Sequence, residues 1–153
     1  MTTLRPLRWT DFLTAYRLAS DPDERANARD HTMPTLRGHF RWMRKWVGGR
    51  LCKAWTIRVD GKAAGIVRVE RRAYPLNEQE MSVVLFPKYR GKRLAQWGIK
   101  EVAGTMHAMT MWVTTAYIKK GNRASMGAFR RAGFRFTGRV VNGLSQFVYD
   151  GGE

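Results

Sequence analysis

The stretch "EMSVVLFPKYRGKRLAQWGIKEV", residues 80–102, constrains the fold more than any other part of the sequence. Residues 83–86 are apolar at every position, as expected of a strand buried in the centre of a sheet, and Pro87 ends this strand. A basic loop around Gly91 follows, and a helix is then predicted with one apolar face, formed by Ala95, Ile99, Val102, Met106 and Met109. The first N–H groups of a helix are unpaired and carry partial positive charge, so this strand–loop–helix unit predicts an α/β fold with an anion-binding site.

The rest of the sequence completes a mixed α/β order. Alternating patterns predict strands over 3–9, 111–118, 134–140 and 144–150, and a hairpin that turns at Asp60-Gly61 and ends at Glu70. The polar stretch 21–31 is expected to be a loop or a short helical turn. Three further helices are expected: one from a Thr10 N-cap with Phe12, Tyr16 and Ala19 on one face, one from Leu36 through Phe40 and Met43 to Val47, and one over 122–133 closed by Gly133. The order β-α-α-β-β-β-α-β-α-β-β predicts one α/β domain with a mixed sheet, residues 1–153.

Charge narrows the class of partner. The chain carries 28 Lys and Arg against 12 Asp and Glu, a formal net charge of +16, and residues 119–139 hold seven cations and no acid. This balance predicts anionic partners, such as nucleic acid, phosphorylated cofactors or nucleotide-linked substrates, although arginines that only solvate the surface would give the same composition. The lone Cys52 excludes an internal disulfide, and no apolar run is long enough to span a bilayer. We expect a cytoplasmic monomer or homodimer without a metal ion or membrane contact.

Two segments carry a family resemblance. "VVLFPKYRGKRLA" and "KKGNRASMGAFRRAGF", together with the order of elements from about Leu4 to Tyr149, resemble the GNAT superfamily of acyl-CoA N-acyltransferases. The cofactor loop of that superfamily is commonly Q/R-x-x-G-x-G/A, and residues 90–95 here match its first and last positions. Arg93 stands where the middle glycine is usual, which argues against a very tight wrap of the loop around a phosphate.

The resemblance implies acetyl-CoA as the cofactor. Its pyrophosphate would lie on the main chain of Arg90, Gly91, Lys92, Arg93, Leu94 and Ala95. Asn122 and Ser125 match the family's second segment and would contact the pantetheine or phosphate part, and the strand backbone at Val83, Val84 and Leu85 would stabilise the oxyanion. Phe129 occupies the cofactor-side position at which many GNAT enzymes carry an acidic Tyr. Lys88, Lys92 and Arg123 could meet the 3′-phosphate or the substrate.

The expected chemistry is direct attack of an amine on the acetyl thioester. An amine attacks only when it is unprotonated, so a base is needed, and Glu80 is the candidate, with Glu78, Glu70 and the loop residue His31 as alternatives. Because Phe129 has no proton to give, the general acid would be Tyr117 or Tyr89, or the thiolate would leave unassisted. Cys52 is interpreted as a packing residue, and His39 and His107 as structural residues.

The acceptor stays open in the sequence. An anionic small molecule or a peptide is expected, with a nucleotide-linked amino sugar or a protein N-terminus as the two acceptors that the resemblance suggests. Trp42, Trp46 and Trp55 could stack on a sugar or base, or could simply pack in the core. The alternative function is a basic GNAT-like protein that binds nucleic acid, or modifies nucleic acid or the ribosome, through residues 88–100 and 119–139 interleaved with Phe129, Phe134 and Phe136.

Overall fold

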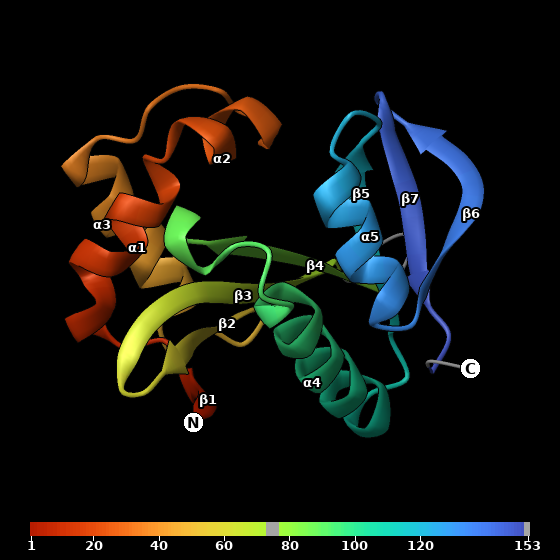
Figure 1. Ribbon diagram of the computed structural model, residues 1–153, viewed down its shortest axis with the longest axis horizontal. Helices are drawn as coiled ribbons and strands as arrows, with labels where there is room; N and C mark the ends of the chain where they lie inside the picture. The colour runs from red at the N-terminus through yellow and green to blue at the C-terminus, as the bar shows by residue number, and fades with distance from the viewer. Residues whose placement is uncertain (73–76, 152–153) are drawn as a thin grey trace.

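The computed structural model describes residues 1–72 and 77–151. In these residues seven strands form one sheet in the order β1-β2-β3-β4-β5-β7-β6, and neighbouring strands are antiparallel except for the parallel pair β4 and β5 (Figure 1). The predicted α/β fold with a mixed sheet is confirmed. The strands are β1 (Thr2–Pro6), β2 (Cys52–Val59), β3 (Lys62–Arg72), β4 (Glu78–Leu85), β5 (Val113–Lys119), β6 (Phe134–Val141) and β7 (Leu144–Tyr149).

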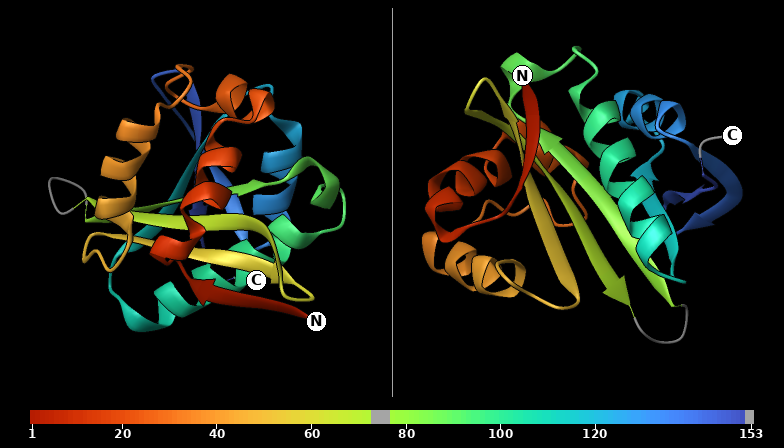
Figure 2. Two further views of the ribbon diagram at one scale, coloured as in Figure 1. Left: turned by 90° about the vertical axis from the view of Figure 1, so that its left-hand side faces the viewer. Right: turned by 90° about the horizontal axis from the view of Figure 1, so that it is seen from below.

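The helices cover both faces of the sheet. Figure 2 shows α1 and α3 on one face of β2–β4 and α4 on the other. Across the described ranges, no helix combines the length and the apolarity that a bilayer crossing requires. The helices are α1 (Phe12–Ala19), α2 (Pro22–Asn27), α3 (Leu36–Trp46), α4 (Leu94–Met109) and α5 (Arg123–Arg131), with short 3-10 turns at Trp9–Asp11 and Pro87–Tyr89.

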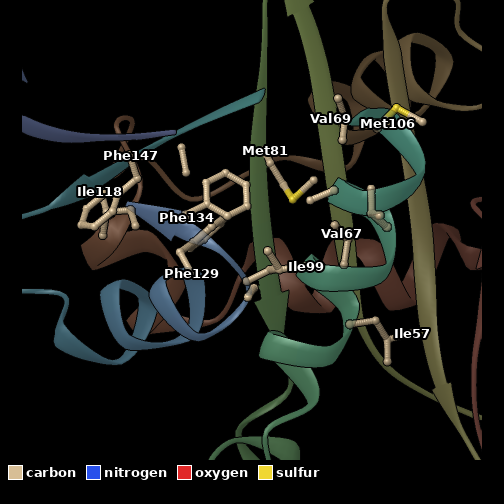
Figure 3. Close-up of a cluster of buried hydrophobic side chains, with 14 of the residues drawn as sticks. Ile57, Val67, Val69, Met81, Ile99, Met106, Ile118, Phe129, Phe134 and Phe147 are labelled. Atoms are coloured by element: carbon tan, nitrogen blue, oxygen red, sulfur yellow. The ribbon is translucent and has the colours of Figure 1, made fainter. Parts of the chain in front are cut away.

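Alternate residues of β3 pack into two separate hydrophobic cores, one on each face of the sheet. Val67 and Val69 point to the face covered by α4 and pack with Ile99 and Met106, in a cluster that continues to Phe129 on α5 (Figure 3). Ile66 points to the other face and packs with Leu18, Met43 and Trp46. Because successive side chains of a strand lie on opposite faces, Arg68 and Glu70 share the face of Ile66. The same side of the sheet therefore carries the α1–α3 core and a row of charged side chains.

The polar stretch after α1 forms the short helix α2. The Asp21 carboxylate accepts a hydrogen bond from the Glu24 N–H at 3.2 Å, and Pro22 occupies the first turn, where its missing N–H costs nothing. Of the two forms expected for this stretch, the structure has the helical one. Its effect is to fix the carboxylates of Asp21 and Asp23 in place.

The N-terminus of α1 and the buried face of α3 differ from the prediction. The predicted N-cap Thr10 lies inside a 3-10 turn, and Asp11 occupies the N-cap position of α1. The buried Asp11 carboxylate makes no capping hydrogen bond to α1, because it is held by Arg5 and by the Arg8 N–H. In α3, Leu36 and Phe40 are 58% and 50% exposed, whereas the core takes His39, Met43 and Trp46. The rotation follows from His39, whose Nε2 lies 3.1 Å from the Phe12 carbonyl oxygen and whose ring stacks on Trp42.

Candidate active site

A fork in the sheet forms the framework of the site. The parallel pairing of β4 with β5 runs from Glu78 to Glu80, opposite residues 113–115, and stops there. The pairing of β4 with β3 continues to Leu85. The Phe86 N–H donates to the Ala64 carbonyl at 2.9 Å, so alternation along an antiparallel ladder turns the N–H groups of Val83 and Leu85 away from β3 and into the fork.

Two cavities open along this fork. The first, which we call the loop cavity, has a volume of about 530 Å³ and lies between β4, the start of α4 and α5. The second, the Glu80 cavity, has a volume of about 370 Å³ and lies between α2, α3 and strands β3–β5. Both cavities are lined by Glu24, Asn27, Val83, Asn122 and Ser125, so they adjoin at the open edge of β4.

The loop cavity has the features of an anion site. Gly91 and Arg93 both have left-handed backbones, with φ of 74° and 62°. Arg93 is the N-cap position of α4 but its side chain does not cap the helix, which leaves the N–H groups of the first turn open. Arg93 thus adopts the backbone conformation that usually selects glycine, so its main chain can follow the same path as the family's middle glycine.

Arg90 is held by the protein itself. Its guanidinium donates to Asp21 and to Asp23, both at 2.7 Å, and to the Leu85 carbonyl oxygen at 3.1 Å. The side chain therefore ties the loop to α2 and to the end of β4. Arg93 and Arg131 also line the cavity, and within residues 1–72 and 77–151 neither forms an ion pair, so these two cations are available for phosphate.

Most of the predicted cofactor residues line the loop cavity, but three do not. Lys92 is exposed beside the Tyr89 ring, and Leu94 packs against the core below the loop. Phe129 is 2% exposed, packs edge-on against Phe134 and borders the Glu80 cavity instead, because its ring lies on the core-facing side of α5. The predicted residues that do line the loop cavity are Val83, Val84, Leu85, Arg90, Gly91, Arg93, Ala95, Asn122 and Ser125.

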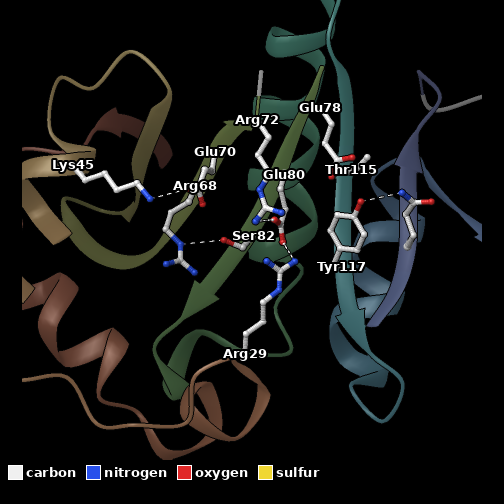
Figure 4. A network of polar contacts seen from close by, with 11 residues as sticks. Arg29, Lys45, Arg68, Glu70, Arg72, Glu78, Glu80, Ser82, Thr115 and Tyr117 are labelled. Atoms are coloured by element: carbon white, nitrogen blue, oxygen red, sulfur yellow. Dashed lines mark hydrogen bonds and ion pairs between the residues drawn. The ribbon is translucent and has the colours of Figure 1, made fainter. Parts of the chain in front are cut away.

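Glu80 lies in the second cavity between two arginines (Figure 4). Its carboxylate accepts from Arg29 at 2.6 Å and pairs with Arg72 at 2.8 Å. Burial raises the pKa of Glu80 above its ordinary value, although the positive charges of Arg29 and Arg72 oppose the shift. A carboxyl group with a raised pKa can take a proton from an amine more readily than an ordinary one.

Tyr117 lines the same cavity from β5. The Gln146 Nε2 donates to its hydroxyl oxygen at 3.0 Å, and the Arg29 guanidinium lies 5.5 Å from the ring centre. Burial raises the pKa of Tyr117, so the phenol keeps its proton at neutral pH. Tyr89, the other predicted acid, lines neither cavity and lies beneath Lys88.

The alternative bases lie in different surroundings. His31 is exposed outside both cavities, with its Nε2 2.7 Å from the Lys119 Nζ. The buried Glu78 accepts a hydrogen bond from Thr115 at 3.0 Å, and Glu70 lines the Glu80 cavity but pairs with Lys45 at 2.8 Å. The structure therefore brings Glu80 and Tyr117 together and leaves His31 apart.

Several residues for which the sequence suggested a possible functional role are buried in the core. Cys52 is buried in the cluster of α1 and α3 and lines neither cavity, and burial raises the pKa of its thiol. Phe134 is 3% exposed, so of the three aromatics of the predicted nucleic-acid footprint only Phe136 reaches the surface. Trp42 and Trp46 line the Glu80 cavity, whereas Trp55 packs against the core.

The structure adds residues that the sequence patterns did not single out. Arg29 and Arg68 reach the Glu80 cavity from the segment after α2 and from β3. Ala124, Ala128 and Arg131 line the loop cavity from one face of α5, and their spacing of four and three residues is the signal that could have identified them. Gln96 lines this cavity too, and within the described ranges its buried Oε1 lacks a hydrogen-bond partner. An open helix N-terminus, two cations and an unpaired amide oxygen suit the phosphates and amides of acetyl-CoA.

Solved structures of other proteins share this fold. A domain from Methanocaldococcus jannaschii superposes with a TM-score of 0.83 at 16% identity, covering 97% of each chain. Spermidine N-acetyltransferase from Vibrio cholerae, in complex with CoA and spermine, gives 0.80 at 14% identity, covering 96% of this chain and 94% of the other. AAC(6′)-Ib with ribostamycin and coenzyme A gives 0.80 at 12%, covering 97% and 92%. At these identities the likeness concerns the fold.

The family follows from the sequence itself. No curated protein sequence matches the chain significantly. The family model described as "Acetyltransferase (GNAT) domain" matches residues 2–135, which include β4, the loop of residues 90–95 and α5. The chain belongs to the GNAT acetyltransferase family and is an acyltransferase that uses acetyl-CoA.

Proposed function

We propose that this protein transfers the acetyl group of acetyl-CoA to a small primary amine that enters the Glu80 cavity. The observation that carries the proposal is the meeting of the two cavities at Val83, inside the fork between β4 and β5. A cofactor in one cavity and an amine in the other would then meet at unpaired main-chain N–H groups. Holding two reactants in this way removes much of the entropic cost of their encounter.

The residues of the loop cavity bind acetyl-CoA and orient it. When bound, acetyl-CoA supplies an activated acetyl thioester. The N–H groups of the first turn of α4, with Arg93 and Arg131, hold the phosphates, while Arg90 keeps the loop fixed to α2. The Val83 N–H points into the fork, where it stabilises negative charge on the carbonyl oxygen as the amine attacks.

The residues of the Glu80 cavity move protons. Glu80 takes the proton of the attacking amine, directly or through one water, and its raised pKa suits that role. Tyr117 keeps its proton at neutral pH and lines the same cavity, so its hydroxyl is the donor for the departing thiolate. Glu80 is the base in this mechanism, as the sequence led us to expect, and the alternative His31 faces solvent outside the cavity.

The acceptor class follows from size and charge. The Glu80 cavity, at about 370 Å³, suits a small molecule or the first residue of a peptide. Its lining holds the acids Glu24, Asp30, Glu70 and Glu80 and the bases Arg25, Arg29, Arg68 and Lys119, so it recognises local charges on the acceptor rather than one overall sign. An amino sugar linked to a nucleotide would place its diphosphate outside this cavity.

The test is acetyl-CoA-dependent release of free thiol across a panel of amino acids, amino sugars, sugar nucleotides, peptides and polyamines. We expect turnover with at least one class of primary amine, and an increase in melting temperature with acetyl-CoA alone, because the cofactor binds only the folded state. If millimolar acetyl-CoA leaves the melting temperature unchanged and no amine in the panel releases thiol, the proposal is wrong.

A further inference from the structure

Arg68 is a cation in the wall of the Glu80 cavity whose hydrogen-bonding capacity is mostly unused. Its Nε donates to the Ser82 hydroxyl at 3.0 Å. Its Nη2 lies 4.0 Å from the Glu24 carboxylate, too far for a hydrogen bond. In the part of the chain that the structure describes, the two Nη groups have no other polar partner, so four of the five N–H donors of the guanidinium lack a protein acceptor and face the cavity.

The surroundings of Arg68 solvate its positive charge poorly. The Arg68 side chain is only 25% exposed, and its guanidinium carbon lies 5.8 Å from the ring centres of both Trp42 and Trp46. Burial lowers the pKa of Arg68, since the charged form is poorly solvated there. The two indoles hold the guanidinium and stabilise it through cation–π contact, but they satisfy none of its N–H groups.

The other cations of the Glu80 cavity have partners. Arg29 donates to Glu80, Arg25 donates to the carbonyl oxygens of Asp30 and Thr32, and Lys119 donates to the carbonyl oxygen of Ala26 at 2.7 Å. Within residues 1–72 and 77–151, Arg68 is thus the cation of this cavity that lacks a hydrogen-bonded acceptor other than one neutral hydroxyl. A ligand with a planar oxyanion would supply acceptors for the free N–H groups of Arg68.

The strand register places Arg68 beside the proposed base. Arg68 is paired with Ser82 and Glu70 with Glu80, so all four side chains share one face of the sheet (Figure 4). Arg68 and Glu80 are diagonal neighbours, a relation that separates Cα atoms by about 7–8 Å. One small molecule can therefore present an anionic group to Arg68 and an amine to Glu80.

We propose that the acceptor is an amino acid, a molecule that carries a carboxylate for the Arg68 guanidinium together with the primary amine that is acetylated. This inference rests on the proposed transferase function and names its substrate class. A guanidinium matches a carboxylate through two parallel hydrogen bonds, which fixes the orientation of the acceptor as well as its charge. Polyamines lack the carboxylate and leave Arg68 unpaired.

The experiment compares amino acids with their carboxamides, which keep the amine and lose the anion, and with an amino sugar phosphate as a second source of oxyanion. The readout is thiol release with acetyl-CoA. We expect kcat/KM for the best amino acid to exceed that for its amide about tenfold or more. Equal use of acid and amide, or a preference for the sugar phosphate or a polyamine, would overturn the amino-acid assignment while leaving the transferase proposal in place.

Arg68→Met keeps much of the side-chain packing between the indoles and removes the donors. We expect it to raise KM for the amino acid about tenfold or more and to lower the kcat/KM for the amide much less. Arg71→Met is the matched control, because Arg71 is the next residue of β3 and its guanidinium carbon lies 5.8 Å from the Trp112 ring centre, outside the cavity. An equal loss for acid and amide in a folded Arg68→Met protein contradicts the inference.

If no amine releases thiol, calorimetry of the same amino acids in the presence of CoA separates the two proposals. Binding that is at least tenfold weaker in Arg68→Met supports the carboxylate site while the transferase proposal fails. Absence of binding to both proteins overturns the site as well.

Discussion

The Arg29 Nη2 lies 2.6 Å from the Glu80 Oε1, and this contact joins the segment after α2 to the central strand β4. The positive charge of Arg29 lowers the pKa of Glu80, while burial raises it. Burial has the larger effect, so the pKa of the proposed base is raised, and Arg29, from a separate part of the chain, limits the rise. Predictions for turnover and for its pH dependence follow from this pair.

Glu80→Gln should reduce kcat about 10²–10⁴-fold, because the amide cannot take a proton from the amine. The affinity for acetyl-CoA should stay the same, since Glu80 does not line the loop cavity. Steady-state kinetics and calorimetric titration with acetyl-CoA provide the two measurements. Glu70→Gln is the matched control, because Glu70 is paired directly opposite Glu80 yet bonds to Lys45. Undiminished turnover in Glu80→Gln would remove Glu80 from the mechanism.

Arg29→Ala should move the acid limb of the pH–rate profile to higher pH. Loss of the positive neighbour disfavours the carboxylate, so the pKa of Glu80 rises further and the base becomes protonated at a higher pH. The profile of kcat/KM reports this pKa for the free enzyme. Arg25→Ala provides the comparison, since Arg25 lines the same cavity without contacting Glu80. A shift to lower pH, or identical shifts in both variants, would contradict the assignment.

Arg93→Gly should make the protein more stable and bind acetyl-CoA less tightly. Glycine relieves the left-handed backbone at φ of 62°, a gain of about 1 kcal/mol, which corresponds to about 2–4 °C in melting temperature. Loss of the guanidinium removes a phosphate contact, which should weaken binding about tenfold. Arg93→Lys separates the two effects, because it keeps a positive charge and the backbone strain. Tighter cofactor binding by Arg93→Gly would show that the Arg93 side chain obstructs the site.

His39 should make the folded state sensitive to acid. Burial lowers the pKa of His39 below its ordinary value of 6.5, so below about pH 6.5 the unfolded chain binds a proton that the folded chain refuses. Stability should therefore fall as the pH decreases through this value. Melting temperatures between pH 8 and 5 should show a smaller decline for His39→Phe than for the wild type. Parallel curves for the two proteins would refute the role of His39.

Cys52→Ala should leave kcat and KM unchanged. The thiol is buried among α1 and α3 core residues, outside both cavities, and its raised pKa keeps it protonated. Mass spectrometry of the wild type after incubation with acetyl-CoA should find no acetyl group on Cys52. An inactive but folded Cys52→Ala protein would point to a covalent acyl-enzyme.

Short sequence patterns were sufficient to predict most of the strands and helices. The apolar run before Pro87, the Asp60-Gly61 turn and the Asn122 N-cap are signals within a few residues, and the corresponding strand, hairpin and helix form where they indicate. Helix faces were harder to predict. Apolar spacing placed Leu36 and Phe40 inward, but the hydrogen bond of His39 to the Phe12 carbonyl turned α3 the other way.

The site was predictable where it consists of main chain and less so where it consists of side chains. The basic loop of residues 90–95 before a helix is a pattern of consecutive residues, and the family resemblance pointed to this loop and to the strand at Val83, both of which line the loop cavity. Arg29 and Glu80 are 51 positions apart, and nothing local announces their contact. Arg68 likewise looks like one more surface cation of β3 until Trp42 and Trp46, from α3, are seen around it.

The short parallel pairing between β4 and β5 also has a mechanical consequence. The sheet has two parts, β1–β4 and β5–β7–β6, which pair with each other only between residues 78–80 and 113–115 of the described chain. A molecule bound in the gap would contact both parts of the sheet, since Val83 belongs to β4, and Asn122 and Ser125 follow directly after β5. We therefore expect occupancy of the fork to restrain both parts of the sheet, and not only the residues that touch the occupant.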